Sequence, residues 1–394
     1  MRRQLEGSRA VAEAVRLCRP RVIAAYPITP QTHIVEHLSQ MVADGELAAE
    51  CINTESEFAA ASVALGAVAA GARAYTASAA QGLLLMTEVL FNIAGLRLPV
   101  VMTCANRAVG APINIFNDHQ DSLSLRDAGW IQLYVESNQE AVDSMIQAYR
   151  IAEACELPVM VCMDGFFLTH TFEPVELPEQ AQVDAWLPPL RFSRALDPVA
   201  PATLGGGSEP DNYLEYRRAQ HQALDHAADE IVSTAAAFQS TFGRTHGALI
   251  DGYRLDDAER VLITLGSVMG AVRDTVDALR ERGERVGALK LRCVRPFPAA
   301  GLVHALRGAR RVAVLEKAIS AGAGGIIAAE LRAAMHAAGI ALPVDGFVGG
   351  LGGRDLTPAS IEAVFAASAA AGPAPIGCQF VDVDAADEAA RPGE

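Results

Sequence analysis

The sequence lacks features that mark several large classes of protein. No apolar run approaches the roughly 20 residues that a membrane-spanning helix needs, so we expect no membrane partner. Lys and Arg number 32 against 47 Asp and Glu, giving a net charge of −15. Nucleic-acid surfaces need clustered basic side chains, so we expect no nucleic-acid partner either. The segment Met1–Gly7 has no apolar core after its basic pair, which predicts no secretory signal and a cytoplasmic location.

Cysteine is present, but never as a C-x-x-C pair. Wide spacing and an odd count predict reduced, mostly buried thiols. Without a spaced cysteine motif the chain is not expected to hold an iron–sulfur cluster, so redox chemistry would need a cofactor or a partner. The seven residues are Cys18, Cys51, Cys104, Cys155, Cys162, Cys293 and Cys378.

Two phosphate-binding signatures are also missing. Thr76–Gly82 follows an apolar stretch and contains small residues, but it lacks the Gly-Lys-Ser/Thr ending of a P-loop. Ser320–Gly325 is rich in glycine but lacks the G-x-G-x-x-G spacing. An NAD-binding dehydrogenase is therefore disfavoured.

What the chain does have is length and alternation. It contains 394 residues, 51% of them hydrophobic, which predicts a globular protein of two or three domains. Buried-strand runs alternate with helical spacing, which predicts an α/β fold with parallel sheets covered by helices. The expected strands of the first part are 22–25, 49–52, 74–76, 98–104, 130–135 and 158–163, and the expected helices are 31–43, 55–71, 81–91 and 139–155.

The alternation divides the chain into four parts. We predict a first domain over 1–167 and a Pro-rich excursion with a long helix over 168–255. A second α/β domain over 256–365 contains expected strands at 261–265, 286–291, 312–315 and 344–348. The Ala-, Gly- and Pro-rich and then acidic segment 366–394 is expected to be a tail.

Four segments carry polar residues at predicted strand or helix ends. The turn Tyr26–Pro30 follows the strand 22–25, and its two prolines would hold the hydroxyl of Thr29 in place. Glu55 and Glu57 precede an Ala-rich helix, Arg107 follows the strand 98–104, and Asp118–Asp121 is a polar cluster. Each has a structural explanation when taken alone: loop packing, helix capping, a surface charge and a local turn network.

Taken together and in order, these segments resemble the alpha subunits of the 2-oxoacid:ferredoxin oxidoreductases, most closely the PorA type of pyruvate:ferredoxin oxidoreductase. The matching pieces are Tyr26–Pro30, Ser56-Glu57, Gln81–Met86, Asn114–Asp121, Asp164–Phe166, Arg295–Pro298 and Gly350–Asp355. The resemblance implies a pyrimidine-binding domain of thiamine diphosphate enzymes, followed by a domain like the C-terminal domain of transketolase.

The resemblance also implies roles for single residues. Glu57 would bond N1′ of the cofactor's aminopyrimidine, so that the 4′ nitrogen can take the C2 proton of the thiazolium. Thr29 and Arg107 would hold the substrate's carboxylate and keto oxygen. The other implied cofactor-binding residues are Pro27, Ile28, Gln81 and Gly82, and the substrate-loop candidates are Asp118, His119 and Gln120.

The chain supplies only half of such a site. The diphosphate is anchored through Mg²⁺ by Gly-Asp-Gly and a later Asn, and none of the Asp-Gly pairs here has the preceding Gly. We therefore expect no metal ligand in this chain. A beta subunit would carry the Mg²⁺ half-site, and partner subunits, including gamma and delta types, would carry the [4Fe-4S] clusters. The implied reaction is oxidative decarboxylation of a 2-oxoacid with coenzyme A, reducing ferredoxin.

Alternatives remain at the level of substrate and role. Pyruvate is favoured, but the same chemistry on phenylglyoxylate or 2-oxoisovalerate, with electrons passed through a flavin subunit to NAD, fits the same residues. A non-catalytic assembly subunit that binds no cofactor is the alternative from another class.

Overall fold

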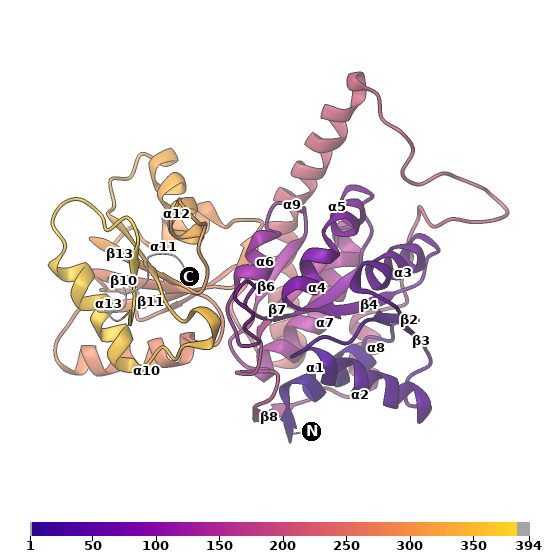
Figure 1. Cartoon of the computed structure of the whole chain (residues 1–394), viewed down its shortest axis with the longest axis horizontal. Helices are drawn as coiled ribbons and strands as arrows, with labels where there is room; N and C mark the ends of the chain where they lie inside the picture. The colour runs from indigo at the N-terminus through magenta and orange to yellow at the C-terminus, as the bar shows by residue number, and fades with distance from the viewer. Residues whose placement is uncertain (1, 384–394) are drawn as a thin grey trace. The chain divides into compact units, whose positions relative to one another are not determined.

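The computed structural model describes residues 2–383, which form two compact units (Figure 1). Unit 1 contains the chain up to Asp251 together with Arg292–Pro298. Unit 2 contains Gly252–Leu291 and the described residues from Ala299 onward. Both units are α/β with mostly parallel sheets, which confirms the predicted fold class.

The sheet of unit 1 has seven strands in the order β12-β6-β7-β5-β4-β2-β3. All neighbours pair in parallel except β12, which runs antiparallel to β6. The four strands β4, β5, β6 and β7 are buried along their whole length, as expected for the interior of a parallel sheet. The strands are β2 (Val22–Ala25), β3 (Glu50–Asn53), β4 (Ala74–Ser78), β5 (Val101–Asn106), β6 (Ile131–Tyr134), β7 (Val159–Asp164) and β12 (Cys293–Arg295).

Helices cover both faces of this sheet. In Figure 1, α1 and α2 lie on one side of it and α3, α4 and α5 on the other. Helix α7 packs against α1 and β7, and its N-cap Ser137 accepts a hydrogen bond from the Glu140 N–H. The helices are α1 (Gly7–Leu17), α2 (Thr32–Ala43), α3 (Glu57–Ala69), α4 (Ala80–Leu85), α5 (Thr87–Gly95), α6 (Gln120–Ser124) and α7 (Asn138–Cys155).

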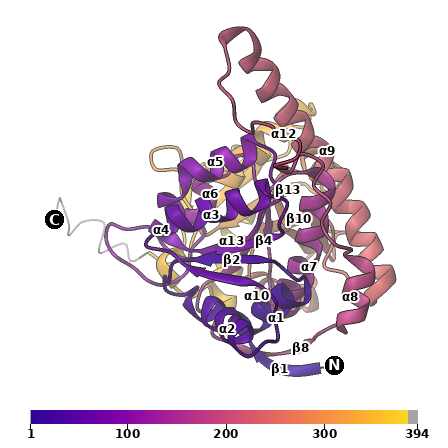
Figure 2. The same ribbon diagram turned by 90° about the vertical axis from the view of Figure 1, so that its right-hand side faces the viewer.

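The excursion after β7 belongs to unit 1. Strand β8 (Phe172–Glu176) pairs antiparallel with β1 (Arg2–Glu6), and α8 (Gln180–Trp186) follows. Helix α9 (Pro210–Phe242) has 33 residues and begins at a proline, where the missing N–H costs nothing. Only a sparse stripe of α9 is buried, and it packs on α7 and α5 (Figure 2).

Unit 2 has a six-stranded sheet in the order β15-β14-β13-β10-β11-β9. Its apolar core includes Leu262, Val276, Leu315 and Phe347. The strands are β9 (Ile250–Tyr253), β10 (Arg260–Thr264), β11 (Val286–Leu291), β13 (Arg311–Glu316), β14 (Val344–Val348) and β15 (Gln379–Phe380). The helices are α10 (Met269–Glu281), α11 (Ala299–Ala305), α12 (Ile326–Ala337), the short η1 (Leu351–Gly353) and α13 (Pro358–Ala370).

The two units differ from the boundaries expected from sequence in three places. Residues 168–251 are part of unit 1, because β8 and α9 pack on its other elements. Residues 292–298 also cluster with unit 1, since β12 pairs with β6. The expected tail 366–394 begins inside α13, and Gln379–Phe380 extend the sheet beside β14. Residues 384–394 of that tail lie outside the described part of the chain.

Within the described residues, no helix combines the length and apolarity that crossing a bilayer requires.

Candidate functional site

The candidate site residues follow the carboxyl ends of four neighbouring parallel strands. The turn Tyr26–Pro30 follows β2, the start of α4 follows β4, Arg107 follows β5, and Gly165 follows β7. Because carboxyl ends of parallel strands meet at one edge of a sheet, the sequence-distant segments come together there. Ligands bind at this edge in open α/β sheets.

The Glu57 side chain lies at the start of α3, directly against Gly82. Glu57 is 6% exposed, and within the described residues its carboxylate has no hydrogen bond or ion pair. A Cβ atom at residue 82 would lie 2.7 Å from Cδ and 2.8 Å from Cγ of Glu57. The absence of a side chain at Gly82 therefore makes room for this carboxylate. A largely buried carboxylate with no hydrogen-bond donor among the described residues is suited to a ligand that donates one.

Arg107 and Thr29 are in direct contact. The Arg107 guanidinium donates from Nη1 to the Thr29 backbone carbonyl at 3.0 Å and from Nε to the Asn114 carbonyl at 3.1 Å. Burial lowers the pKa of Arg107 from its ordinary value, and the Asp121 carboxylate partly offsets this. The arginine remains charged, because even a lowered guanidinium pKa stays far above neutral. The two predicted substrate ligands thus lie side by side, with the arginine bonded to the stiff turn.

Neighbouring small residues pack against the turn Tyr26–Pro30 and fix its position. A Cβ atom at Gly165 would lie 2.6 Å from Cγ of Pro30, so glycine permits this close approach. Ile28 packs against Ala79, Ala80 and Ala105 at the ends of β4 and β5. These small residues leave room for the turn to pack against the ends of β4 and β5.

Two predicted cofactor-binding residues, Pro27 and Gln81, lie at the exposed margin of the candidate site. Pro27 is exposed in the turn, and the Gln81 side chain points to Gly110, where a Cβ atom would meet its Nε2 at 2.8 Å.

Asp121 ties the strand ends to one another. Its Oδ2 accepts hydrogen bonds from the Ala80 N–H at 2.9 Å and the Arg107 N–H at 3.0 Å. Its Oδ1 accepts from Nδ2 of Asn106 at 2.8 Å. Ala80 has a φ of 48°, a left-handed conformation that costs an alanine on the order of 1–3 kcal/mol. The Asp121 carboxylate holds this strained start of α4 and also positions Arg107.

The three substrate-loop candidates lie in different environments. His119 is fully buried, with Nε2 2.7 Å from Oδ1 of Asp164. Asp118 is nearly buried and accepts a hydrogen bond from the Gln120 N–H at 3.0 Å, while Gln120 is half-buried. His119 therefore lies inside unit 1 and has no contact with solvent. Its hydrogen bond to the Asp164 carboxylate at the end of β7 holds it there.

The nearest thiol is chemically inert. Burial, together with Cys162 and Asp121, raises the pKa of Cys104 well above its ordinary value. Burial likewise raises the pKa of Tyr134, which exchanges a 2.7 Å hydrogen bond with Ser122. Neither group is ionised at neutral pH.

Asp121 is the residue whose role sequence reasoning missed. Asp121 lies in the polar cluster Asp118–Asp121, of which the resemblance implies a substrate role only for Asp118, His119 and Gln120. A signal existed: Asp121 lies in the first turn of α6, and one buried carboxylate can satisfy several N–H groups at strand ends.

Comparison with known proteins connects this geometry to a family. Residues 13–235 match the family described as "Pyruvate flavodoxin/ferredoxin oxidoreductase, thiamine diP-bdg", and residues 258–361 match "Pyruvate:ferredoxin oxidoreductase core domain II". The chain is 52% identical over 364 residues to pyruvate synthase subunit PorA of Methanosarcina barkeri, covering 91% of this chain and 90% of that protein. It is 39% identical over 365 residues to ketoisovalerate oxidoreductase subunit VorA of Pyrococcus horikoshii, covering 92% and 93%.

A solved structure shares the fold. The 2-oxoglutarate:ferredoxin oxidoreductase from Magnetococcus marinus aligns with a TM-score of 0.71 at 20% identity, covering 93% of this chain. This chain spans 65% of the length of that chain. At such low identity the likeness concerns the fold.

Proposed function

We propose a role for this chain within the family to which it belongs, the pyruvate flavodoxin/ferredoxin oxidoreductases: it is the alpha subunit of a multi-subunit 2-oxoacid oxidoreductase. The proposed reaction is oxidative decarboxylation of pyruvate with coenzyme A, giving acetyl-CoA, CO₂ and reduced ferredoxin. One observation carries the proposal: the nearly buried Glu57 carboxylate, without a protein partner among the described residues, lies against Gly82.

The residues present fit thiamine diphosphate. The cofactor supplies an electron sink for the carbon–carbon bond cleavage. Glu57 would accept a hydrogen bond from the protonated N1′ of its aminopyrimidine, which answers the carboxylate's need for a donor. The matched family model is that of a thiamine diphosphate-binding domain and includes Glu57 and Gly82.

Arg107 and Thr29 would orient the 2-oxoacid. The fixed charge of Arg107 attracts the substrate's carboxylate, and its bond to the Thr29 carbonyl keeps the turn at a constant distance. The Thr29 hydroxyl, on an exposed residue beside this charge, would donate to the keto oxygen. Holding a substrate in a near-attack geometry lowers the barrier without any covalent contribution from these residues.

The other half of the site would come from a beta subunit. This chain has no Gly-Asp-Gly motif for Mg²⁺, and none of its cysteines stands in a C-x-x-C pair. We propose that partner subunits provide the diphosphate and Mg²⁺ ligands and the [4Fe-4S] clusters, and that the complex is cytoplasmic. Gamma- and delta-type subunits complete the proposed assembly.

Pyruvate is the proposed substrate because of the named relatives. The pyruvate synthase subunit is 52% identical and the ketoisovalerate subunit 39% identical, over nearly the same length. Measuring kcat/KM of the purified complex for pyruvate, 2-oxoisovalerate and phenylglyoxylate tests this choice. A preference for either bulky acid would contradict it.

The cofactor role is tested by Glu57→Gln in the assembled complex, with Glu55→Gln as the matched control. Glu55 is exposed and two residues away, so its substitution should leave turnover unchanged. Glu57→Gln should lower turnover by about 100-fold or more, since general acid–base groups contribute about 10²–10⁴-fold. Exchange of the C2 proton of bound thiamine diphosphate, followed by NMR, should slow in parallel. Near-normal turnover of Glu57→Gln would favour the non-catalytic assembly role.

A further inference from the structure

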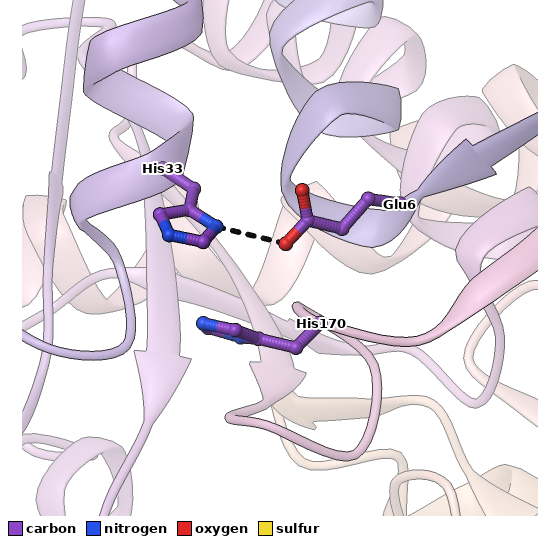
Figure 3. Close-up of side chains that lie close together, drawn as sticks. All are labelled: Glu6, His33 and His170. Atoms are coloured by element: carbon purple, nitrogen blue, oxygen red, sulfur yellow. Dashed lines mark hydrogen bonds and ion pairs between the residues drawn. The ribbon is translucent and has the colours of Figure 1, made fainter.

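Three side chains of the kinds that bind metal ions lie close together near the turn Tyr26–Pro30, and they take no part in the proposed reaction. Glu6, His33 and His170 each contribute one ligand atom to a group in which all these atoms lie within 4.8 Å of one another (Figure 3). Glu6 ends β1, His33 is in the first turn of α2, and His170 lies between β7 and β8. Three segments far apart in the sequence therefore converge at one point.

We propose that Glu6, His33 and His170 form a binding site for a zinc-like divalent transition-metal ion. Two imidazoles and one carboxylate are a ligand set that Zn²⁺ uses with a fourth position open to water. Bonds of about 2.0–2.1 Å place tetrahedral ligand atoms about 3.4 Å apart, so the atoms need to approach by at most about 1.5 Å. Nδ1 of His33 and Oε1 of Glu6 are hydrogen-bonded at 2.8 Å, so an ion would replace this bond and these two atoms would move apart by about 0.6 Å.

Neighbouring side chains contact the two histidine rings and limit their orientations. The rings of His33 and His170 stack with centroids 4.7 Å apart, and Phe166 stacks on His170 at 4.8 Å. Nδ1 of His170 lies 2.7 Å from Oγ1 of Thr169, which in turn accepts the Phe166 N–H. Metal-bound histidines are usually oriented through their second ring nitrogen in this way.

Charge and access also suit a cation. The nearby basic side chains Arg3 and Arg9 bind Glu13, which leaves Glu6 to the imidazoles. All three side chains are partly exposed, so an ion and a water ligand can reach them.

His37 provides a nearby fourth group. It lies one turn after His33 on α2, with Nε2 3.8 Å from Oε2 of Glu6. A metal at this point would join β1, α2 and the β7–β8 segment, and it would anchor α2 three residues after Pro30.

The test is zinc binding by the full chain, free of any affinity tag and assembled with its partners. We expect one saturable zinc ion per chain at this site, with a dissociation constant of about 1 µM or tighter, measured by competition with a chromogenic chelator. Glu6→Gln, His33→Ala and His170→Ala should each weaken binding by about 10-fold or more. His221→Ala is the matched control, because His221 is an exposed histidine on α9 paired with Asp225, and it should change nothing.

A second measurement does not depend on how the variants fold. Titration of the wild-type complex with Co²⁺ should produce the visible absorption of a four-coordinate ion, and Zn²⁺ should abolish it. Difference spectra against the untreated complex remove the background of the iron–sulfur clusters. The proposal is overturned if wild-type protein binds no stoichiometric zinc at this site, or if binding survives in the Glu6→Gln and His170→Ala variants. In either case the cluster is a hydrogen-bonded carboxylate–imidazole group only.

Discussion

Replacing Gly82 with alanine tests the catalytic geometry without removing any catalytic group. The new Cβ atom would lie 2.7 Å from Cδ and 2.8 Å from Cγ of Glu57, whereas carbon atoms in contact normally lie about 3.5–4.0 Å apart. The Glu57 carboxylate must therefore move by about 1 Å. A misplacement of this size can lower the rate by about 100-fold. We expect Gly82→Ala to lower kcat/KM for pyruvate by about that factor.

The free energy of unfolding of Gly82→Ala should change less than its kcat/KM. Alanine stabilises a helix relative to glycine by about 0.5–1 kcal/mol, while overpacking costs about 1–3 kcal/mol. The net loss of unfolding free energy is thus at most about 2.5 kcal/mol, and thermal melting of the complex measures it.

Gly66→Ala is the control for Gly82→Ala. Gly66 lies inside α3, the helix that begins with Glu57, and a Cβ atom there meets nothing within 4 Å. Gly66→Ala should show the helix stabilisation that alanine gives relative to glycine, without any loss of activity. Wild-type kcat/KM and cofactor affinity in Gly82→Ala would refute the assigned role of the Glu57 carboxylate, as would an equal loss of activity in Gly66→Ala.

Three further predictions concern buried charges. Arg292→Met should destabilise the protein by about 3–5 kcal/mol in denaturant unfolding, because it removes the buried guanidinium that lies 3.1 Å from the fully buried carboxylate of Glu140. The control Arg218→Met, at an exposed residue, should have no effect. Asp121→Asn should lower kcat/KM by about 10-fold with little change in cofactor affinity, since an amide has one acceptor oxygen where the carboxylate has two; unchanged kinetics would contradict its positioning role. Burial raises the pKa of Glu316 to about 7, so the folded state binds this proton more tightly than the unfolded state does. The stability of wild type relative to Glu316→Gln should therefore fall as pH rises from about 4.5 to about 7 and then level off, and a difference that does not vary with pH would contradict it.

The parallel sheets could be predicted because their strands are continuous apolar runs. The stretch before Arg107 predicted β5, and Val22–Ala25 is the observed β2. The antiparallel β1–β8 pair had no such signal, because Arg2–Glu6 is polar and pairs with residues about 170 positions later. The three-residue β12 was assigned to the second domain because nothing local shows that Cys293 pairs with Leu133.

The roles of Thr29, Glu57 and Arg107 stay predictions that rest on the family resemblance, because each residue taken alone has a structural explanation. The structure adds that Arg107 bonds the Thr29 carbonyl and that Glu57 lies against Gly82. His119 was expected on a substrate loop, yet it is buried against Asp164, a contact between residues 45 positions apart. The zinc-site candidates were missed altogether, because Glu6, His33 and His170 have no sequence spacing that links them.

Exposed apolar side chains flank the catalytic segments of unit 1. Tyr26 lies in the turn, Phe58 follows Glu57, Leu85 is on α4, and Ile113 and Phe116 follow β5, with Ile113 84% exposed. Single exposed apolar residues are common, but a group around one sheet edge is typical of an interaction surface. This supports a partner subunit that covers the edge. Covering it would remove water from Glu57 and Arg107, and charges act more strongly in such a dry site. A partner subunit that closed the site would account for both the proposed half-site and the exposed apolar side chains around it.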